Sequence, residues 1–129
     1  MVGTNVGSGS LYEGPTGFSR ARRIGRYIAV AGTAPIAPDG SPAHLGDLYR
    51  QTLRCLEIIE KALKDLGAER GNVIRTRVYL TDAAQWREAA RAHGEYFRKI
   101  RPACTFIVVK GLLEPEWLVE VEADAVLED

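Results

Sequence analysis

The sequence predicts one α+β domain, a two-layer sandwich in which two helices cover one face of a mixed sheet of about five strands. Two segments with apolar residues at every third or fourth position predict the helices, and several extended segments predict the sheet. A chain of 129 residues, 46% of them hydrophobic, is long enough for one core. We expect residues 1–16, rich in Gly and Ser, to form a flexible segment and residues 17–129 to form the domain.

The first predicted element is an antiparallel hairpin of residues 18–24 and 27–33. Gly25-Arg26 separates the two extended segments, and a two-residue connection that contains Gly is typical of a tight hairpin turn. The hairpin is therefore expected to begin the sheet.

A long helix is predicted next. Ser41 and Pro42 end a turn-rich region and are suited to the N-cap and the first helical position. Apolar side chains then recur at helical spacing as far as Leu66, and Gly67 marks the end of the helix.

Residues 72–80 alternate in polarity, which predicts a half-buried strand. Thr81-Asp82 is expected to cap a second helix, and Pro102 ends it because proline cannot continue a helix. One face of the strand carries Ile74, Thr76, Val78 and Leu80, and the other carries Arg75, Arg77 and Tyr79.

Two final strands are predicted for residues 101–110 and 118–126, joined by a short turn-rich loop. The last strand alternates Glu120, Glu122 and Asp124 with small apolar residues, so that three carboxylates share one face. Together with the arginines of residues 72–80, and some of those of residues 20–23, they give the sheet a face of mixed charge. Such a face is compatible with solvation and with burial against copies of the same chain, where each charge meets an opposite one.

Composition excludes several classes of function. Lys plus Arg and Asp plus Glu both number 17, so that no net charge favours nucleic acid or an anionic membrane surface. The apolar runs are too short to span a bilayer, and the first residues lack the pattern of a secretion signal, which makes a cytoplasmic protein the expectation. Two cysteines without Cys-x-x-Cys spacing and two histidines without partners at ligand spacing predict no metal site.

Four stretches carry a resemblance to a known family. Val30-Ala-Gly-Thr-Ala-Pro35, Val73-Ile-Arg-Thr-Arg-Val-Tyr-Leu-Thr-Asp82, Arg101-Pro-Ala-Cys-Thr and Leu118-Val-Glu-Val-Glu-Ala123 resemble the RidA/YjgF/YER057c/UK114 family, in the same order of elements from about Phe18 onward. The resemblance implies a chorismate mutase-like fold that assembles into a homotrimer, with the sheets forming a central barrel and small-molecule ligands bound in clefts between subunits.

The resemblance also implies an activity, the hydrolysis of reactive enamines and imines such as 2-aminoacrylate and 2-iminobutanoate without a cofactor. In the family a glutamate positions water near the imine carbon, and this role carries over to Glu120. An arginine in a Pro-Ala-Arg motif binds the substrate carboxylate, but this chain has Cys104 at that position. Loss of a bidentate contact of this kind costs about a hundredfold or more in affinity, so that an altered substrate specificity is expected.

The other cleft positions implied by the resemblance also depart from the deaminating members. Phe18 stands where a tyrosine is common and Ala31 where a serine is common, and the loop before the last strand is lengthened around Trp117. These changes remove hydrogen-bonding groups or add apolar bulk. The implied cleft comprises Phe18, Ala31, Gly32, Cys104, Thr105 and Trp117, with Glu120 as the catalytic residue.

Three interpretations of Cys104 remain open on the residues alone: a small buried residue, the lining of an altered cleft, or a nucleophile. In the second, a nearby cation supplies the lost charge, with Arg20, Arg22, Arg101 and Lys110 as candidates. For Glu120 a catalytic role competes with a structural ion pair to Arg75 or Arg77.

The function that the sequence favours is a cofactor-free imine or enamine deaminase of altered specificity. The alternative is a non-catalytic homotrimer that binds a small metabolite. RNA cleavage or translation inhibition, which the resemblance also brings in, is disfavoured by the zero net charge.

Overall fold

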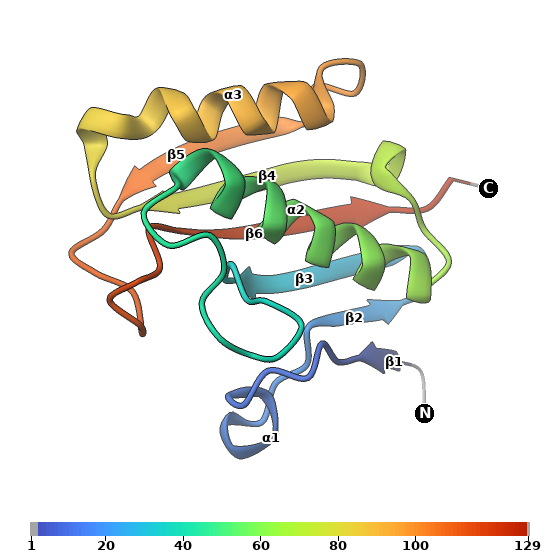
Figure 1. Ribbon diagram of the computed structural model, residues 1–129. Helices are drawn as coiled ribbons and strands as arrows, with labels where there is room; N and C mark the ends of the chain where they lie inside the picture. Colours follow the sequence, from blue (N-terminus) through green and yellow to red (C-terminus); the bar gives the residue numbers. More distant parts are fainter. Residues whose placement is uncertain (1–2, 129) are drawn as a thin grey trace.

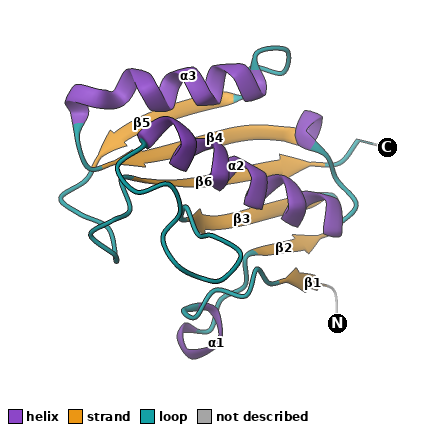
Figure 2. Ribbon diagram, viewed as in Figure 1, coloured by secondary structure: helices purple, strands orange, loops and turns teal. Residues whose placement is uncertain are grey.

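The computed structural model describes residues 3–128 and shows a six-stranded sheet with two long helices on one face (Figures 1 and 2). The sheet has the order β1-β2-β3-β6-β4-β5. The strands are β1 (Gly3–Val6), β2 (Ala21–Ile24), β3 (Tyr27–Thr33), β4 (Val73–Leu80), β5 (Ala103–Val108) and β6 (Val119–Val126). The helices are α1 (Glu13–Thr16), α2 (Leu48–Asp65) and α3 (Trp86–Phe97), with 3-10 turns at Arg70–Asn72 and Ala83–Gln85. The two-layer α+β prediction is confirmed, with one strand more than the expected five.

The additional strand comes from the segment that composition suggested would be flexible. β1 pairs antiparallel with β2, and the short helix α1 ends at Gly17, whose φ of 78° is the left-handed conformation typical of a helix C-terminus. Residues 1–2 of that segment lie outside the described residues. Pairing with a sheet edge uses backbone groups, so that a Gly- and Ser-rich composition does not reveal it.

The predicted hairpin is confirmed. β2 and β3 are antiparallel with Ile24 opposite Tyr27, and Gly25 has a φ of 59°. A side chain at this turn position would strain the backbone, and Gly has none.

The long helix begins later than predicted, so the assignment of Ser41 as its N-cap is wrong. α2 starts at Leu48, and the Asp47 side chain accepts the cap hydrogen bond from the Arg50 backbone N–H. Between the two positions the backbone adopts positive φ at His44 (49°) and Gly46 (75°), which a helix cannot accommodate.

The last two strands are not neighbours, although a short loop joins them. β4 lies between β5 and β6, pairing parallel with β5 and antiparallel with β6. The parallel pair β4–β5 is connected through α3, as parallel strands require a crossover. β6 occupies the centre of the sheet and also pairs with β3.

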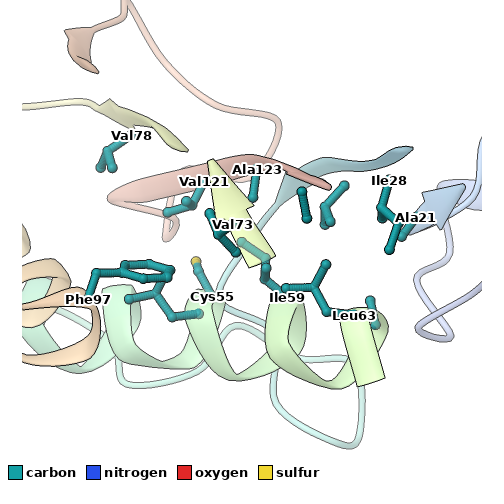
Figure 3. Packing of buried hydrophobic residues seen from close by; sticks show 14 of the residues in the cluster. Ala21, Ile28, Cys55, Ile59, Leu63, Val73, Val78, Phe97, Val121 and Ala123 are labelled. Atoms are coloured by element: carbon teal, nitrogen blue, oxygen red, sulfur yellow. The ribbon is translucent and has the colours of Figure 1, made fainter. Parts of the chain in front are cut away.

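The core lies between the sheet and the two helices α2 and α3. Figure 3 shows Cys55, Ile59 and Leu63 of α2 directed toward the sheet, where Val121 and Ala123 of β6 meet them. Cys55 is fully buried, as its place in the helical pattern predicted.

One residue of β4 departs from the predicted alternation. Ile74 was expected on the core side, but its side chain is 53% exposed because a β-bulge shifts the register to β6 between Val73 and Arg75. A bulge adds one residue to a strand and therefore changes the face to which that residue points.

No helix within residues 3–128 combines the length and apolar character that crossing a membrane requires.

Candidate functional site

The open face of the sheet, opposite the helices, carries paired charges on β4 and β6. Arg77 lies 3.5 Å from the Glu122 carboxylate and 3.6 Å from that of Asp124. The Tyr79 hydroxyl donates a hydrogen bond to Glu122. Two of the three carboxylates predicted on this face are therefore held by partners on the neighbouring strand.

Glu120 differs from those two carboxylates. It is directly opposite Tyr79 in β4, yet its carboxylate makes no hydrogen bond or ion pair within residues 3–128. Burial, and to a smaller extent the charge of Glu122, raises the pKa of Glu120, although the Arg20 guanidinium opposes this. The structural ion pair to Arg75 or Arg77 that competed with a catalytic role is absent for this residue.

A bulge in β3 makes room for this carboxylate. Val30 pairs with Ala123 and Thr33 with Val121, so that Ala31 and Gly32 lie together opposite a single residue of β6. A Cβ at position 32 would lie 2.5 Å from the Oε2 atom of Glu120. Gly32 is therefore required for the observed position of the carboxylate, because no side chain fits between it and β3.

Arg20 is the positive charge that acts on Glu120, but other groups of the chain already bind its guanidinium. Its side chain donates hydrogen bonds to the Gly32 carbonyl, to Thr33 Oγ1 at 3.1 Å and to Ser8 Oγ at 3.2 Å. It also forms an ion pair with Glu13 at 3.4 Å, and only 4% of the residue is exposed. Arg20 lies 5.5 Å from the centre of the Phe18 ring, which brings Phe18 to the same end of the sheet as Gly32.

Cys104 and Thr105 lie on the outer strand β5, on opposite faces. Cys104 pairs with Thr76, whose side chain is buried under the helices, whereas Thr105 pairs with Arg77 of the open face. The cysteine residue itself is exposed at the sheet edge. Neighbouring atoms nevertheless desolvate the thiol in part, which raises the pKa of Cys104, and a hydrogen bond with Thr76 opposes this only in part. A thiol in this state is mostly protonated at neutral pH and is a weak nucleophile.

Sequence reasoning did not find His93, which is linked to this thiol through Thr76. Thr76 Oγ1 is 2.7 Å from His93 Nε2, and Thr76 also contacts Cys104. Burial lowers the pKa of His93, which makes its imidazole neutral near pH 7 and a weak base. The parallel register of β4 and β5 brings Thr76 and Cys104 together, and His93 reaches Thr76 from α3. The spacing along the chain contains no signal of these contacts.

Trp117 was expected at the cleft, but the structure places it in a different environment. The residue is 5% exposed and its ring makes an edge contact with Tyr12, with 6.1 Å between the ring centres. Its Nε1–H has no hydrogen-bond acceptor among residues 3–128. It lines a cavity of about 420 Å³ to which neither Phe18 nor Glu120 contributes.

Within one chain the predicted cleft residues therefore form separate groups. Ala31, Gly32 and Glu120 lie together, with Phe18 linked to them through Arg20. Cys104 lies beyond β4 on the helix side of the sheet. The first group offers a half-buried carboxylate without a partner, which can accept a proton from a bound water molecule.

Comparisons with known proteins identify the family. The family model described as endoribonuclease L-PSP matches residues 13–127. A protein of Streptomyces coelicolor is 38% identical over 120 residues, covering 93% of this chain and 89% of that protein. The 3-aminoacrylate deaminase RutC of Acinetobacter baylyi is 30% identical over 105 residues, covering 81% of this chain and 82% of the enzyme.

A solved structure agrees with both the fold and the sequence match. The crystal structure of a YjgF/YER057c/UK114 family member from Mycobacterium tuberculosis has a TM-score of 0.88 and 42% sequence identity, covering 97% of this chain and 99% of that one. The chain therefore belongs to the RidA/YjgF/YER057c/UK114 family, the family described as endoribonuclease L-PSP.

Proposed function

We propose that this protein is a cofactor-free hydrolase that deaminates reactive imines or enamines, with Glu120 as the general base. The observation that carries the proposal is the state of the Glu120 carboxylate, which is half-buried and without a hydrogen-bond or ion-pair partner within residues 3–128. Its raised pKa makes it a stronger base than an ordinary glutamate. The relative named 3-aminoacrylate deaminase supports the same reaction class.

The proposed reaction needs one water molecule and one carboxylate. Glu120 takes a proton from water as the oxygen attacks the imine carbon and returns it to the nitrogen, giving a neutral tetrahedral carbinolamine. Glu120 then transfers the proton of the carbinolamine hydroxyl to the nitrogen, the C–N bond breaks, and ammonia and a carbonyl compound leave. The reaction consumes one water per imine and needs no redox step, which agrees with the expectation of no cofactor.

We propose that substrate binding depends less on the substrate carboxylate in this protein than it does in other deaminating members of the family. Cys104 stands at the position where the resemblance implies an arginine. Arg20, one candidate replacement, is already engaged by Glu13, Ser8 and Gly32. An imine with an apolar side chain suits such a site better than a small dicarboxylic one.

The active unit is proposed to be a homotrimer with clefts between subunits. Within one chain, Glu120 lies on the open face and Cys104 on the helix side of the outer strand, separated by β4. A cleft that includes both positions therefore requires a second copy. The charges of the open face would then lie in the interior of the assembly, as the family resemblance implies.

The test measures ammonia release from imines generated in situ by an amino acid oxidase acting on methionine, leucine and phenylalanine. Glu120→Gln is expected to lower the rate about a hundredfold or more, the usual contribution of a general base. Glu122→Gln is the matched control, because it removes a carboxylate of the same strand face that is held by Arg77 and Tyr79. We expect it to keep activity within several-fold of the wild type.

Absence of acceleration over buffer with every imine would reject the enzyme proposal. A rise in melting temperature with one of these compounds, without any turnover, would instead support the metabolite-binding homotrimer. Equal losses in the two variants would show that general damage to the sheet face, and not loss of a base, explains the effect.

A further inference from the structure

Arg20, directly before β2, closes the bulge in β3 against which the Glu120 carboxylate lies. A bulge leaves backbone groups without partners on the neighbouring strand. The Arg20 carbonyl accepts a hydrogen bond from the Ala31 N–H at 2.9 Å, and the Arg20 guanidinium donates to the Gly32 carbonyl. The guanidinium also donates to Thr33 Oγ1 at 3.1 Å, and the Thr33 hydroxyl donates to the Ala31 carbonyl at 2.8 Å. One arginine therefore binds both residues of the bulge.

Glu120 contacts the same bulge through Gly32. A Cβ on Gly32 would lie 2.5 Å from the Glu120 Oε2 atom, whereas Arg20 binds the carbonyl oxygen of that glycine. No direct ion pair joins the arginine to the carboxylate in the part of the chain that the structure describes. The glycine is thus the link between them, because any shift of its backbone changes the space that the carboxylate occupies.

Two residues of the N-terminal segment hold Arg20 in this position. Glu13 Oε2 lies 3.4 Å from Arg20 Nη2. Ser8 Oγ accepts a hydrogen bond from Arg20 Nε at 3.2 Å and donates one to Glu13 at 2.6 Å. Arg20 is 4% exposed and Glu13 is 9% exposed, so that loss of either partner leaves the other as an unpaired buried charge. Residues 8–13, which composition suggested would be flexible, are thus tied through Arg20 to the bulge.

The charge of Arg20 acts on Glu120 as well. Arg20 lowers the pKa of this carboxyl group, whereas Glu122 on the same strand raises it. Tyr79 of β4 and Cys55 of α2 are also within electrostatic reach of Glu120, and their own raised pKa values keep both of them neutral near pH 7. Among these four groups, Arg20 carries the positive charge.

We propose that Arg20 is a positioning residue for the general base Glu120, and that Glu13 and Ser8 of the N-terminal segment keep it in place. The proposal rests on the proposed hydrolysis and adds a part of the chain to its site. Arg20 acts through Gly32 and through its charge, not on the substrate, because groups of the same chain already bind its guanidinium. The alternative is an ion pair that only fastens the N-terminal segment to the sheet.

The first test follows the side-chain carboxyl carbon of Glu120 by NMR as a function of pH, and it needs no substrate. Glu120→Gln assigns the signal. Arg20→Gln should raise the pKa of Glu120, because the opposing positive charge is removed. Glu13→Gln should lower it, because the charge of Arg20 is then no longer offset by a carboxylate. An ion pair that only fastens the segment predicts no such pair of opposite shifts.

Arg23→Gln is the matched control. The Arg23 side chain also binds backbone carbonyls, those of Gly25 and Leu66, but it does not contact the β3 bulge. Its loss removes hydrogen bonds of the same kind from the same end of the chain. We expect Arg23→Gln to leave the Glu120 titration and the rate of imine hydrolysis as they are in the wild type.

Initial rates of imine hydrolysis give the second readout. Arg20→Lys keeps the positive charge, but an ammonium group lacks the planar set of donors of a guanidinium and does not reproduce the contacts with Gly32 and Ser8. We expect kcat to fall about tenfold or more, because a displaced catalytic group costs at least that much. KM and the pH at which the rate rises should stay close to those of the wild type. In Arg20→Gln, this pH should rise together with the pKa of Glu120.

An unchanged Glu120 titration in Arg20→Gln, or no downward shift in Glu13→Gln, would overturn the proposal. Equal losses of kcat in Arg20→Lys and Arg23→Gln would do the same. If the Arg20 variants do not fold, the Nε–H signal of Arg20 in the wild type serves instead. It should move with the Glu120 titration and lose that movement in Glu120→Gln, and the same movement in both proteins would reject the link. A wild type without hydrolysis rejects the proposed function, whereas the two titrations still decide whether Arg20 is coupled to Glu120.

Discussion

The position of the Glu120 carboxylate depends on its close contact with Gly32. Glu120 Oε2 occupies the space that a side chain at position 32 would need. The bulge in β3 and the lack of a Cβ at Gly32 together allow the Glu120 carboxylate to pack against the β3 backbone. This arrangement gives the carboxylate its space beside the β3 backbone, where it has no ion pair with residues 3–128.

Gly32→Ala is predicted to reduce imine hydrolysis about tenfold or more, because the methyl group displaces a group that must lie within about 3.2 Å of its target. The control is Gly94→Ala in α3, where a Cβ meets nothing within 4 Å. That variant should keep full activity and gain about 0.5–1 kcal/mol of stability, since Ala favours a helix. Initial rates and urea unfolding measure both effects, and equal activity of the two variants would contradict the role of Gly32.

The raised pKa of Glu120 predicts a pH-dependent effect on stability. A carboxyl group with a higher pKa in the folded state than in the unfolded state is stabilising below its unfolded pKa, and this contribution is lost as pH rises through the folded value. At pH 7 the folded protein therefore holds a charge that burial disfavours. Glu120→Gln should raise the melting temperature at pH 7, with the gain shrinking toward pH 4.

Glu122→Gln is the comparison for this experiment, because it loses a carboxylate engaged by Arg77 and Tyr79. We expect no gain in melting temperature from it at pH 7. A lower melting temperature of Glu120→Gln at pH 7 would mean that the carboxylate has stabilising partners in solution.

Among the elements, α2 provides a test of where the helix begins. Asp47→Ala should cost about 1 kcal/mol, the usual value of an N-cap carboxylate, because Asp47 accepts the hydrogen bond of the Arg50 N–H. Ser41→Ala should change stability by less than about 0.5 kcal/mol, as its hydroxyl contacts only the exposed Asp39. Urea unfolding of both variants measures the change in the free energy of unfolding. A larger decrease for Ser41→Ala than for Asp47→Ala would indicate that the helix begins at Ser41.

The elements with strong local signals could be predicted from the sequence. The hairpin at Gly25, the long helix and the alternating strand β6 each have a pattern that holds within a few residues. The start of α2, the bulge at Ile74 and the separation of β5 from β6 could not be predicted in the same way. They depend on backbone angles and strand pairing between distant segments, which a local pattern does not contain.

The same limit applies to the candidate site. Glu120 and Gly32 were identified because their neighbours along the chain carry the family motifs. Trp117 was placed at the cleft from its loop position, yet the structure buries it against Tyr12. His93 is linked to Cys104 through Thr76, because β4 and β5 pair in parallel and α3 packs His93 against Thr76, contacts between residues far apart in sequence.

At the scale of the whole molecule, the open sheet face combines charge with exposed apolar groups. Ile24, Tyr27 and Ile74 are exposed, and with Val126 they line a groove of about 480 Å³ beside Arg75 and Asp124. Exposed apolar groups rimmed by charge are typical of surfaces that bind another protein. A second copy of the chain is the occupant that the proposed homotrimer requires.

If the proposed homotrimer uses this groove, Ile74→Asp shifts the protein from trimer to monomer in sedimentation experiments, because it adds an unpaired charge to a surface that the proposed assembly buries. Leu45→Asp is the control, since Leu45 is also exposed but lies in the loop before α2. It should leave the trimer intact. A wild-type protein that sediments as a monomer, or a trimer that persists in Ile74→Asp, would contradict this interface.

The position of β6 in the sheet affects how the chain folds during its synthesis on the ribosome. β6 is synthesised after both of its neighbours, with β3 on one side of it and β4 on the other. Until it emerges, the nascent chain holds two half-sheets with no shared partner and an uncovered side of α2. Completion of the sheet must therefore wait until residues 119–126 have left the ribosome, and a chain that stalls before them exposes two strand edges that favour aggregation.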